Sequence, residues 1–282
     1  MNRLLLLAAM GWAMVHGTHA QAQIEISARL QHGRVLQFEP ILCTVRIHNR
    51  TPRPVQVGRG QEVELHFDIS RRPGDFLPER ANARHTDPFT VQPGESVQVV
   101  VNLLDRYPLT RMGPYSARAR VTFGGRSQHS GRMQLDVVPG MRVESVEGTL
   151  TGELGGPRRV CTLLNLTRDG REHLFLRFDD PDAELCYGVH DLGTLIRFAD
   201  PLLQIDLQGR VHVLHQSAPS RYTHSIFRLD GRPVDRVFYT KGYASIRLET
   251  GADGELVVRG GQVYEGDLSV QMPTLPAVVP FR

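Results

Sequence analysis

The chain has 282 residues, of which 40% are hydrophobic and 22% charged, and its formal net charge is +3 at pH 7. This near-neutral balance excludes functions that need a strongly basic surface, so we expect no nucleic-acid partner. The motifs of phosphate-binding loops, serine nucleophile elbows, zinc-binding helices and Cys-x-x-Cys sites are absent from the sequence. We therefore predict no catalytic residues and no cofactor, although acids and bases from distant loops can still assemble an active site.

The first 22 residues have the pattern of a cleaved secretory signal. Arg3 precedes an apolar run over residues 4–15, and small residues at alternate positions follow up to Ala22. The run is too short to cross a bilayer core of about 30 Å, so we expect no transmembrane segment after cleavage. The short signal and the single lysine, Lys241, favour a bacterial protein that is periplasmic or secreted.

Residues 23–139 carry the alternation of half-buried β-strands. Apolar and polar residues alternate in six segments that short turns separate: 24–30, 41–49, 62–69, 96–103, 115–123 and 133–137. No segment has helical periodicity. Short alternating strands without amphipathic helices predict an all-β sandwich.

The start of the strand at 115–123 resembles a tyrosine corner. Leu109 is followed four residues later by Gly113-Pro114-Tyr115. In immunoglobulin-like and fibronectin type III sandwiches, a tyrosine that begins strand F donates its hydroxyl to the backbone upstream. The resemblance implies an immunoglobulin-like sandwich over residues 23–139 and assigns no activity.

The turn dipeptide Pro139-Gly140 marks the predicted domain boundary, because it follows the last strand of the first half. We predict a second antiparallel β-rich domain over residues 140–271 and an extended tail with three prolines over residues 272–282.

Four hairpins are expected in the second domain, with turns at 169–170, 208–210, 230–231 and 251–255. Their glycines Gly209, Gly231 and Gly254 recur every 22 or 23 residues. This weak repeat indicates an open meander or a partial propeller-like sheet, and a second sandwich is the alternative.

The segment 71–87 is the longest irregular stretch of the first half, and it carries Arg71, Arg72, Arg80, Arg84 and His85. Long loops on sandwich domains often make the contacts with a partner. We predict that these five residues bind the partner, and an ordinary solvated loop is the alternative.

Asp180, Asp182 and Glu184 place carboxylates at alternate positions, as a hard cation such as calcium prefers. They are the predicted metal ligands, with a solvated turn as the alternative. His212 and His215 have an odd spacing, which puts them on opposite faces of a strand. We therefore expect that they share no metal ion, and that His215 is a partly buried, hydrogen-bonded histidine of the sheet.

One cluster remains for a hydrolase: Asp179, Asp182, Glu184, His190 and Asp191. His190 beside Asp191 has the pattern of a general base with an orienting carboxylate. The alternative is a loop pair that serves only the fold.

The three cysteines of the mature chain are Cys43, Cys161 and Cys186. Cys43 lies among apolar residues of a strand, so we expect it buried and unpaired. A two-residue hairpin about Asp169-Gly170 places Cys161 opposite Phe178, a short distance along the chain from Cys186. In an oxidising compartment this predicts a Cys161–Cys186 disulfide, with free thiols as the alternative.

Three functions compete. The leading hypothesis is an exported, non-catalytic binding or structural module of the bacterial cell envelope, with a protein or glycan as its partner. The rival is a secreted hydrolase with its acid and base residues on loops of the second domain. The third is an inhibitor or a periplasmic chaperone-like sandwich, which needs an exposed strand edge or a projecting loop.

Overall fold

The computed structural model describes residues 23–150, 156–242, 245–265 and 279–280. Within this part of the chain α1 (Leu103–Arg106) is the only helix, and strands dominate. The prediction of an all-β protein is confirmed. The predicted signal lies outside the described residues, and so does the predicted tail except for Val279–Pro280.

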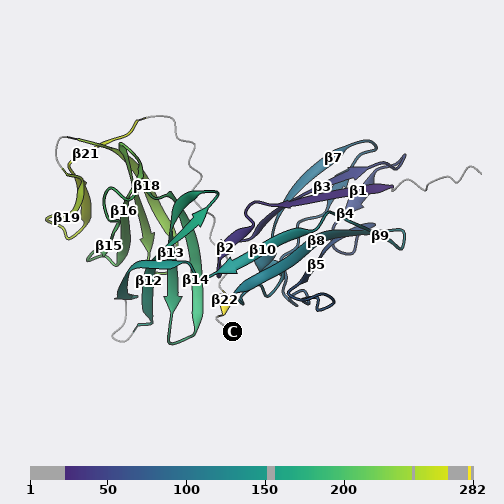
Figure 1. The fold of residues 1–282 in the computed structure, drawn as a ribbon, viewed down its shortest axis with the longest axis horizontal. Helices are drawn as coiled ribbons and strands as arrows, with labels where there is room; N and C mark the ends of the chain where they lie inside the picture. Colours follow the sequence, from purple (N-terminus) through teal and green to yellow (C-terminus); the bar gives the residue numbers. More distant parts are fainter. Residues whose placement is uncertain (1–22, 151–155, 243–244, 266–278, 281–282) are drawn as a thin grey trace, which may run out of the picture.

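Two facing sheets form the first domain (Figure 1). One has the order β1-β3-β7, and the other has the order β2-β10-β8-β5-β4-β6, with β9 paired to β8. The strands are β1 (Ile24–Leu30), β2 (Arg34–Leu36), β3 (Leu42–Asn49), β4 (Val55–Val57), β5 (Val63–Ser70), β6 (Phe89–Val91), β7 (Ser96–Asn102), β8 (Gly113–Phe123), β9 (Arg126–His129) and β10 (Met133–Val138).

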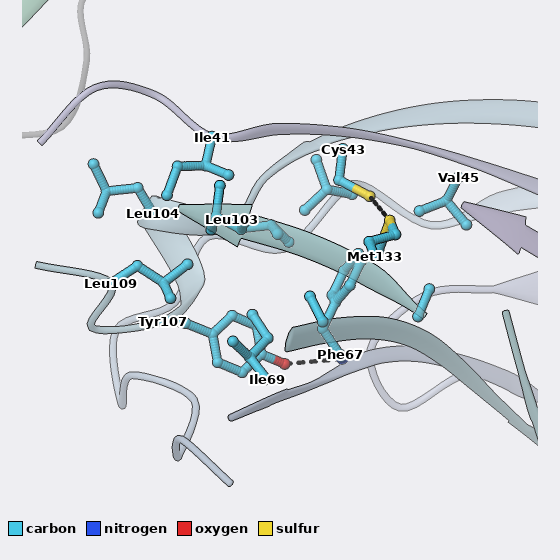
Figure 2. Packing of buried hydrophobic residues seen from close by; sticks show 14 of the residues in the cluster. Ile41, Cys43, Val45, Phe67, Ile69, Leu103, Leu104, Tyr107, Leu109 and Met133 are labelled. Carbon is cyan, nitrogen blue, oxygen red and sulfur yellow. Dashed lines mark hydrogen bonds between the residues drawn. The ribbon is translucent and has the colours of Figure 1, made fainter. Parts of the chain in front are cut away.

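The inward residues of these strands close one core, as their alternation predicts. Cys43 on β3 is fully buried, and its Sγ lies 3.9 Å from the Sδ of Met133 on β10 (Figure 2). The expectation of a buried, unpaired Cys43 is confirmed.

Two tyrosines fasten the connection between β7 and β8 to the sandwich. The hydroxyl of Tyr115 donates to the carbonyl oxygen of Arg111 at 2.6 Å, which is the hydrogen bond that a tyrosine corner implies. The hydroxyl of Tyr107 accepts the buried N–H of Phe67 at 3.0 Å (Figure 2). The second contact could not be predicted from the sequence, because Tyr107 lies outside any alternating segment.

The second domain contains two five-stranded sheets and one hairpin. The orders are β11-β12-β13-β14-β22 and β15-β16-β17-β18-β21, and β19 pairs with β20. The strands are β11 (Met141–Thr149), β12 (Arg158–Arg168), β13 (Arg171–Asp180), β14 (Leu185–Thr194), β15 (Leu202–Ile205), β16 (Arg210–Ala218), β17 (Arg221–Arg228), β18 (Pro233–Lys241), β19 (Arg247–Thr250), β20 (Leu256–Arg259), β21 (Gly261–Val263) and β22 (Val279–Pro280).

All four predicted hairpins are present, and apolar side chains from both large sheets meet in one cluster. Leu163 and Phe178 enter this cluster from the first of these sheets, and Val213 and Phe227 from the second. Because the two sheets enclose a core between them, a second sandwich describes the packing better than a propeller-like meander.

The other face of the β11–β14 sheet packs against the first domain. Its apolar residues belong to the same cluster as the first core, and they are Leu164, Leu166, Phe175, Cys186 and Val189. Gly140, with φ of 75°, lies at the junction, where an added Cβ would come within 2.6 Å of the Leu36 side chain. The predicted boundary dipeptide therefore lies in a tight contact between the domains, so glycine is required there.

A buried ion pair crosses the same junction. Nη2 of Arg168 donates to both carboxylate oxygens of Glu39 at 2.8 Å, and the two side chains are only 3% and 8% exposed. Burial raises the pKa of Glu39 above its ordinary value, and the Arg168 guanidinium opposes that rise. Beside the pair, the Arg177 guanidinium lies 4.9 Å from the ring centre of Phe38, whose φ is 69°. Polar and apolar contacts together join the two sandwiches.

The structure contradicts the predicted Cys161–Cys186 disulfide, since both cysteines are free. Cys161 lies opposite Phe178, as predicted, but Cys186 lies beyond the intervening strand β13, opposite Asp179. Strands are about 4.8 Å apart, so two strand spacings exceed the roughly 7 Å limit for a disulfide. The two thiols also face different cores.

Candidate functional site

The loop that carries the five predicted binding residues is fastened to the sandwich at several points. Phe76 forms a bridge with Ser70, the N–H of Leu77 donates to the carbonyl of Ile69 at 2.7 Å, and the N–H of Arg80 donates to the carbonyl of Arg106 at 2.8 Å. Long loops with such anchors keep a defined shape and can present side chains to a partner.

The loop divides its predicted residues between two grooves. Arg71 and Arg72 line a small pocket of about 180 Å³. Arg80 and His85 line a separate groove of about 420 Å³. Arg84 is exposed and lines neither. The structure therefore does not gather the five residues into one site.

The small pocket lies on the outer face of the seven-stranded sheet, under residues 71–76. Arg118 on β8 pairs across the sheet with Asp68 on β5, and Arg132 lies next to the start of β10 on the other side of Arg118. Ser70 and Ser116 form the next row of the same face. The lining residues are Asp68, Ser70, Arg71, Arg72, Pro73, Gly74, Phe76, Ser116, Arg118 and Arg132.

The Arg80 and His85 groove has balanced charge. It also holds Glu79, whose carboxylate pairs with Nε of the buried Arg106, and His66, whose Nδ1 lies 3.8 Å from Glu79. Burial and the nearby Arg106 guanidinium lower the pKa of His85. Since Glu64 and Glu79 offset the charges of Arg59 and Arg80 in its lining, this groove favours no ligand of one charge.

A larger groove of about 570 Å³ lies where β1 meets β9, and it contains none of the predicted residues. Its Glu25 pairs with Nε of Arg50 at 2.9 Å.

The predicted calcium ligands are not assembled. Asp180 is buried; its Oδ2 accepts from Nη1 of Arg159 at 2.6 Å, and its Oδ1 accepts the N–H groups of Asp182 and Ala183. The N–H of Ala183 is the largest influence that lowers the pKa of Asp180. Asp182 lies 3.6 Å from Arg158 instead. Among the described residues no three His, Cys, Asp or Glu side chains are placed to hold a metal ion.

The side chains of the predicted general base, His190, and its predicted orienting carboxylate, Asp191, point in opposite directions. His190 and Asp191 are neighbours on β14 rather than in a loop, so their side chains lie on opposite faces of the sheet. His190 packs against Phe178 and Phe227 in the second core, whereas Asp191 lies near Arg168 at the domain junction. Asp191 cannot orient His190, which contradicts the sequence-based pairing.

The other members of the predicted hydrolase cluster are also dispersed. Asp179 accepts from Nε of Arg177 at 2.8 Å, and burial raises its pKa. Glu184 has a φ of 52° and lies in the turn after β13. The five residues therefore do not converge on one hollow.

One group of functional side chains was not predicted from the sequence: a buried, hydrogen-bonded series of Asp206, His212 and His224. Nε2 of His212 lies 3.0 Å from Oδ2 of Asp206, and Nδ1 of His212 lies 3.0 Å from Nε2 of His224. The Asp206 carboxylate fixes the proton of His212 on Nε2, so His224 must donate to Nδ1. Burial lowers the pKa of both histidines, to about 4 for His224.

The alternation of side chains could have indicated this hydrogen-bonded series, because His212 and His224 face the same side of the neighbouring strands β16 and β17. The prediction that His212 and His215 lie on opposite faces agrees with their separate contacts. His215 is only 1% exposed, and neither of its ring nitrogens has a partner of standard hydrogen-bond geometry among the described residues. His215 is therefore fully rather than partly buried, and the backbone of Thr194 lies close enough to interact with it and to oppose the lowering of its pKa by burial.

Comparison with known proteins finds no protein family that matches the chain and no significant match to a curated protein. Within the described residues, no helix has the length and apolar character needed to cross a membrane.

Proposed function

We propose that the protein is an exported, non-catalytic binding or structural module of the bacterial cell envelope. In this proposal the first domain is an immunoglobulin-like sandwich that contacts a protein or glycan partner through residues 71–87. The second domain holds the first in a fixed orientation through the Arg168–Glu39 pair. The periplasm or the exterior is the proposed location, because the sequence begins with the pattern of a secretory signal.

The observation that carries this proposal is the anchored loop. Its backbone is bonded to β5 and to Arg106, yet Arg71, Arg72 and Arg84 remain exposed on it. A fixed backbone with exposed arginines loses little conformational entropy when it binds, and arginine is enriched at interfaces.

The test uses the full chain with its native leader, expressed in a bacterium and recovered from separated cell fractions. We expect the protein in the periplasm or medium, and we expect photo-crosslinkers at Arg72 and Arg84 to capture an envelope component. The matched control places the crosslinker at Arg228, an exposed arginine of the second domain. Recovery in the cytoplasm, or equal capture at Arg228, would contradict the proposal.

The hydrolase remains a second candidate, since the Asp206–His212–His224 chain resembles the arrangement that orients a general base. Its test is the rate of ester hydrolysis by wild type and by His224→Gln. An activity that the variant loses supports the enzyme, and equal background rates in both proteins contradict it.

A further inference from the structure

We propose that the pocket formed by Arg71, Arg72, Arg118 and Arg132 binds an oxyanion group, such as phosphate, sulfate or a sugar carboxylate. This inference rests on the proposed binding role of residues 71–87 and names the ligand chemistry of one part of that surface.

The pocket holds an unbalanced positive charge. Four arginines line it, and Asp68 is its only carboxylate. Asp68 is already shared, because Nε of Arg118 lies at 3.3 Å, Nε of Arg120 at 3.2 Å and Nε2 of His129 at 3.2 Å from its oxygens. One carboxylate cannot neutralise the whole group.

Three of the arginines have no carboxylate partner within the described part of the chain. Arg71, Arg72 and Arg132 take part in no ion pair there. Like charges that converge on one hollow repel each other, and a bound anion removes that repulsion. The formal net charge of the whole chain is only +3, so this concentration of positive charge is local.

One guanidinium is held in place before any ligand arrives. Nη2 of Arg71 donates to the carbonyl of Met112 at 3.1 Å, and its guanidinium carbon lies 5.6 Å from the ring centre of Tyr115. Gly113 makes room for it, since a Cβ there would lie 3.3 Å from Nη2. A donor that is already fixed gives stronger binding than a mobile one, because less conformational entropy is lost.

The size and lining define the ligand. A volume of about 180 Å³ is below that of sites for drug-sized molecules, so it fits one anionic group rather than a whole cofactor. Guanidinium groups bind phosphate and carboxylate groups through bidentate hydrogen bonds. Ser70 and Ser116 add hydroxyl donors, and Phe76, which is 55% exposed, offers an apolar face at the rim for a sugar ring.

The experiment titrates the full mature chain by calorimetry at low ionic strength with inorganic phosphate, D-glucuronate and, as a neutral control, D-glucose. We expect saturable binding of the anions, weaker at higher salt, and none of glucose. Tighter binding of glucuronate than of phosphate assigns the pocket to an acidic glycan, and the reverse order assigns it to free phosphate.

Arg72→Gln and Arg132→Gln should each weaken anion binding about tenfold, because each removes one charge-assisted contact. Among the described residues neither arginine side chain has an ion-pair partner, so both variants should fold. Arg126→Gln, at an exposed arginine of β9 outside the pocket, is the matched control and should bind as wild type does.

No saturable binding by wild type, unchanged affinity in both pocket variants, or an equal loss in Arg126→Gln would overturn the inference. Envelope crosslinking at Arg84, which lies outside the pocket, separates the two proposals. If that crosslinking persists while the protein binds no anion, the proposed function stands and this inference fails.

Discussion

At the scale of single residues, most of the chemistry-bearing side chains serve the fold. The sequence analysis named Asp180 as a metal ligand and Asp191 as part of a hydrolase cluster. In the structure Asp180 pairs with Arg159, and Asp191 lies near Arg168, which itself pairs with Glu39. A carboxylate that already accepts several hydrogen bonds is a poor ligand for a metal ion. The exposed arginines of residues 71–87 are the exception, since they have no charged partner in the part of the chain that the structure describes.

Tyr115→Phe should lower the free energy of unfolding by about 1 to 3 kcal/mol, because the carbonyl of Arg111 loses its hydrogen bond while it stays partly buried. Urea denaturation measures the change. The matched control is Tyr264→Phe, at a tyrosine that is 40% exposed, and it should leave the stability unchanged. Equal effects of the two substitutions would mean that Tyr115 is not a corner.

Acid should destabilise the second domain. Burial lowers the pKa of His190, His215 and His224 to about 4 each, from an ordinary value of 6.5. Between these two values the unfolded state binds more protons than the folded state, so stability falls as the pH falls from about 6.5 towards 4. Above pH 6.5 these histidines are neutral in both the folded and the unfolded state, so they no longer make the stability depend on pH.

The measurement is urea unfolding between about pH 7.5 and 4.5, which starts about one unit above the ordinary histidine pKa and covers most of the interval in which stability falls. Each of the three histidines adds up to about 1.4 kcal/mol of lost stability per pH unit. His215→Leu should make this pH dependence shallower, whereas His48→Gln on the outer face of the first domain should not. A pH dependence that His215→Leu leaves unchanged would contradict the assignment.

At the scale of elements, the alternation of side chains located the long strands well. The strands β3, β5, β8 and β10 agree with the predicted segments to within two residues at each end. The four hairpins were also predicted, because glycine turns with flanking alternation identify them without tertiary information. β11 was missed because its residues are mostly half-exposed, so its sequence does not alternate.

Bulges explain why the candidate sites could not be predicted. The register between β13 and β14 shifts between Phe178 and Asp179. Without that shift Cys186 would face the same side as Cys161, and with it Cys186 faces the first domain. One inserted residue reverses every later side chain, and nothing in the local sequence marks its position. That Arg132 and Arg71 line one pocket could not be predicted either, because it depends on the pairing of β8 with both β5 and β10.

The cysteines give an element-scale prediction. Mass spectrometry after alkylation of the unreduced, unfolded protein should count three free thiols, because β13 separates Cys161 from Cys186. In the folded protein alkylation should be slow, since burial raises the pKa of each thiol to about 12. A peptide that contains a Cys161–Cys186 bridge would contradict this arrangement of strands.

At the scale of the whole molecule, the junction between the sandwiches decides whether they behave as one body. The apolar cluster of the first domain continues into the second, and the Arg168–Glu39 pair lies within it. β22, at the C-terminal end, pairs with β14 on the side of the junction (Figure 1). We therefore expect the two domains to unfold together.

Arg168→Met should cost about 3 to 5 kcal/mol, because it leaves the Glu39 carboxylate buried without its partner. Calorimetry should then show two thermal transitions in place of one. The double variant Glu39→Leu with Arg168→Met removes both charges and should regain most of the lost stability. If the single variant keeps one transition at the wild-type temperature, the pair does not couple the domains.

The first domain has its own two-sheet core, so a truncated protein of residues 23–139 should still unfold cooperatively. It should be less stable than the full chain, and it should self-associate, because Leu36 and Phe38 lose the cover of the second domain. Circular dichroism during heating and sedimentation measure both effects. A chain without a cooperative transition would show that residues 23–139 are not an independent domain.

The parallel pairing of β2 with β10 also sets the order in which the chain can fold during synthesis. Arg34 on β2 meets Asp136 on β10, and Glu39 meets Arg168, 129 residues further along the chain. The hairpins of the second domain close as soon as they emerge, whereas β2 must wait for its partner. At a synthesis rate of about 5 to 20 residues per second, that wait lasts on the order of 5 to 20 seconds. For that interval the apolar residues of β2 lack the strand that pairs with them in the folded protein.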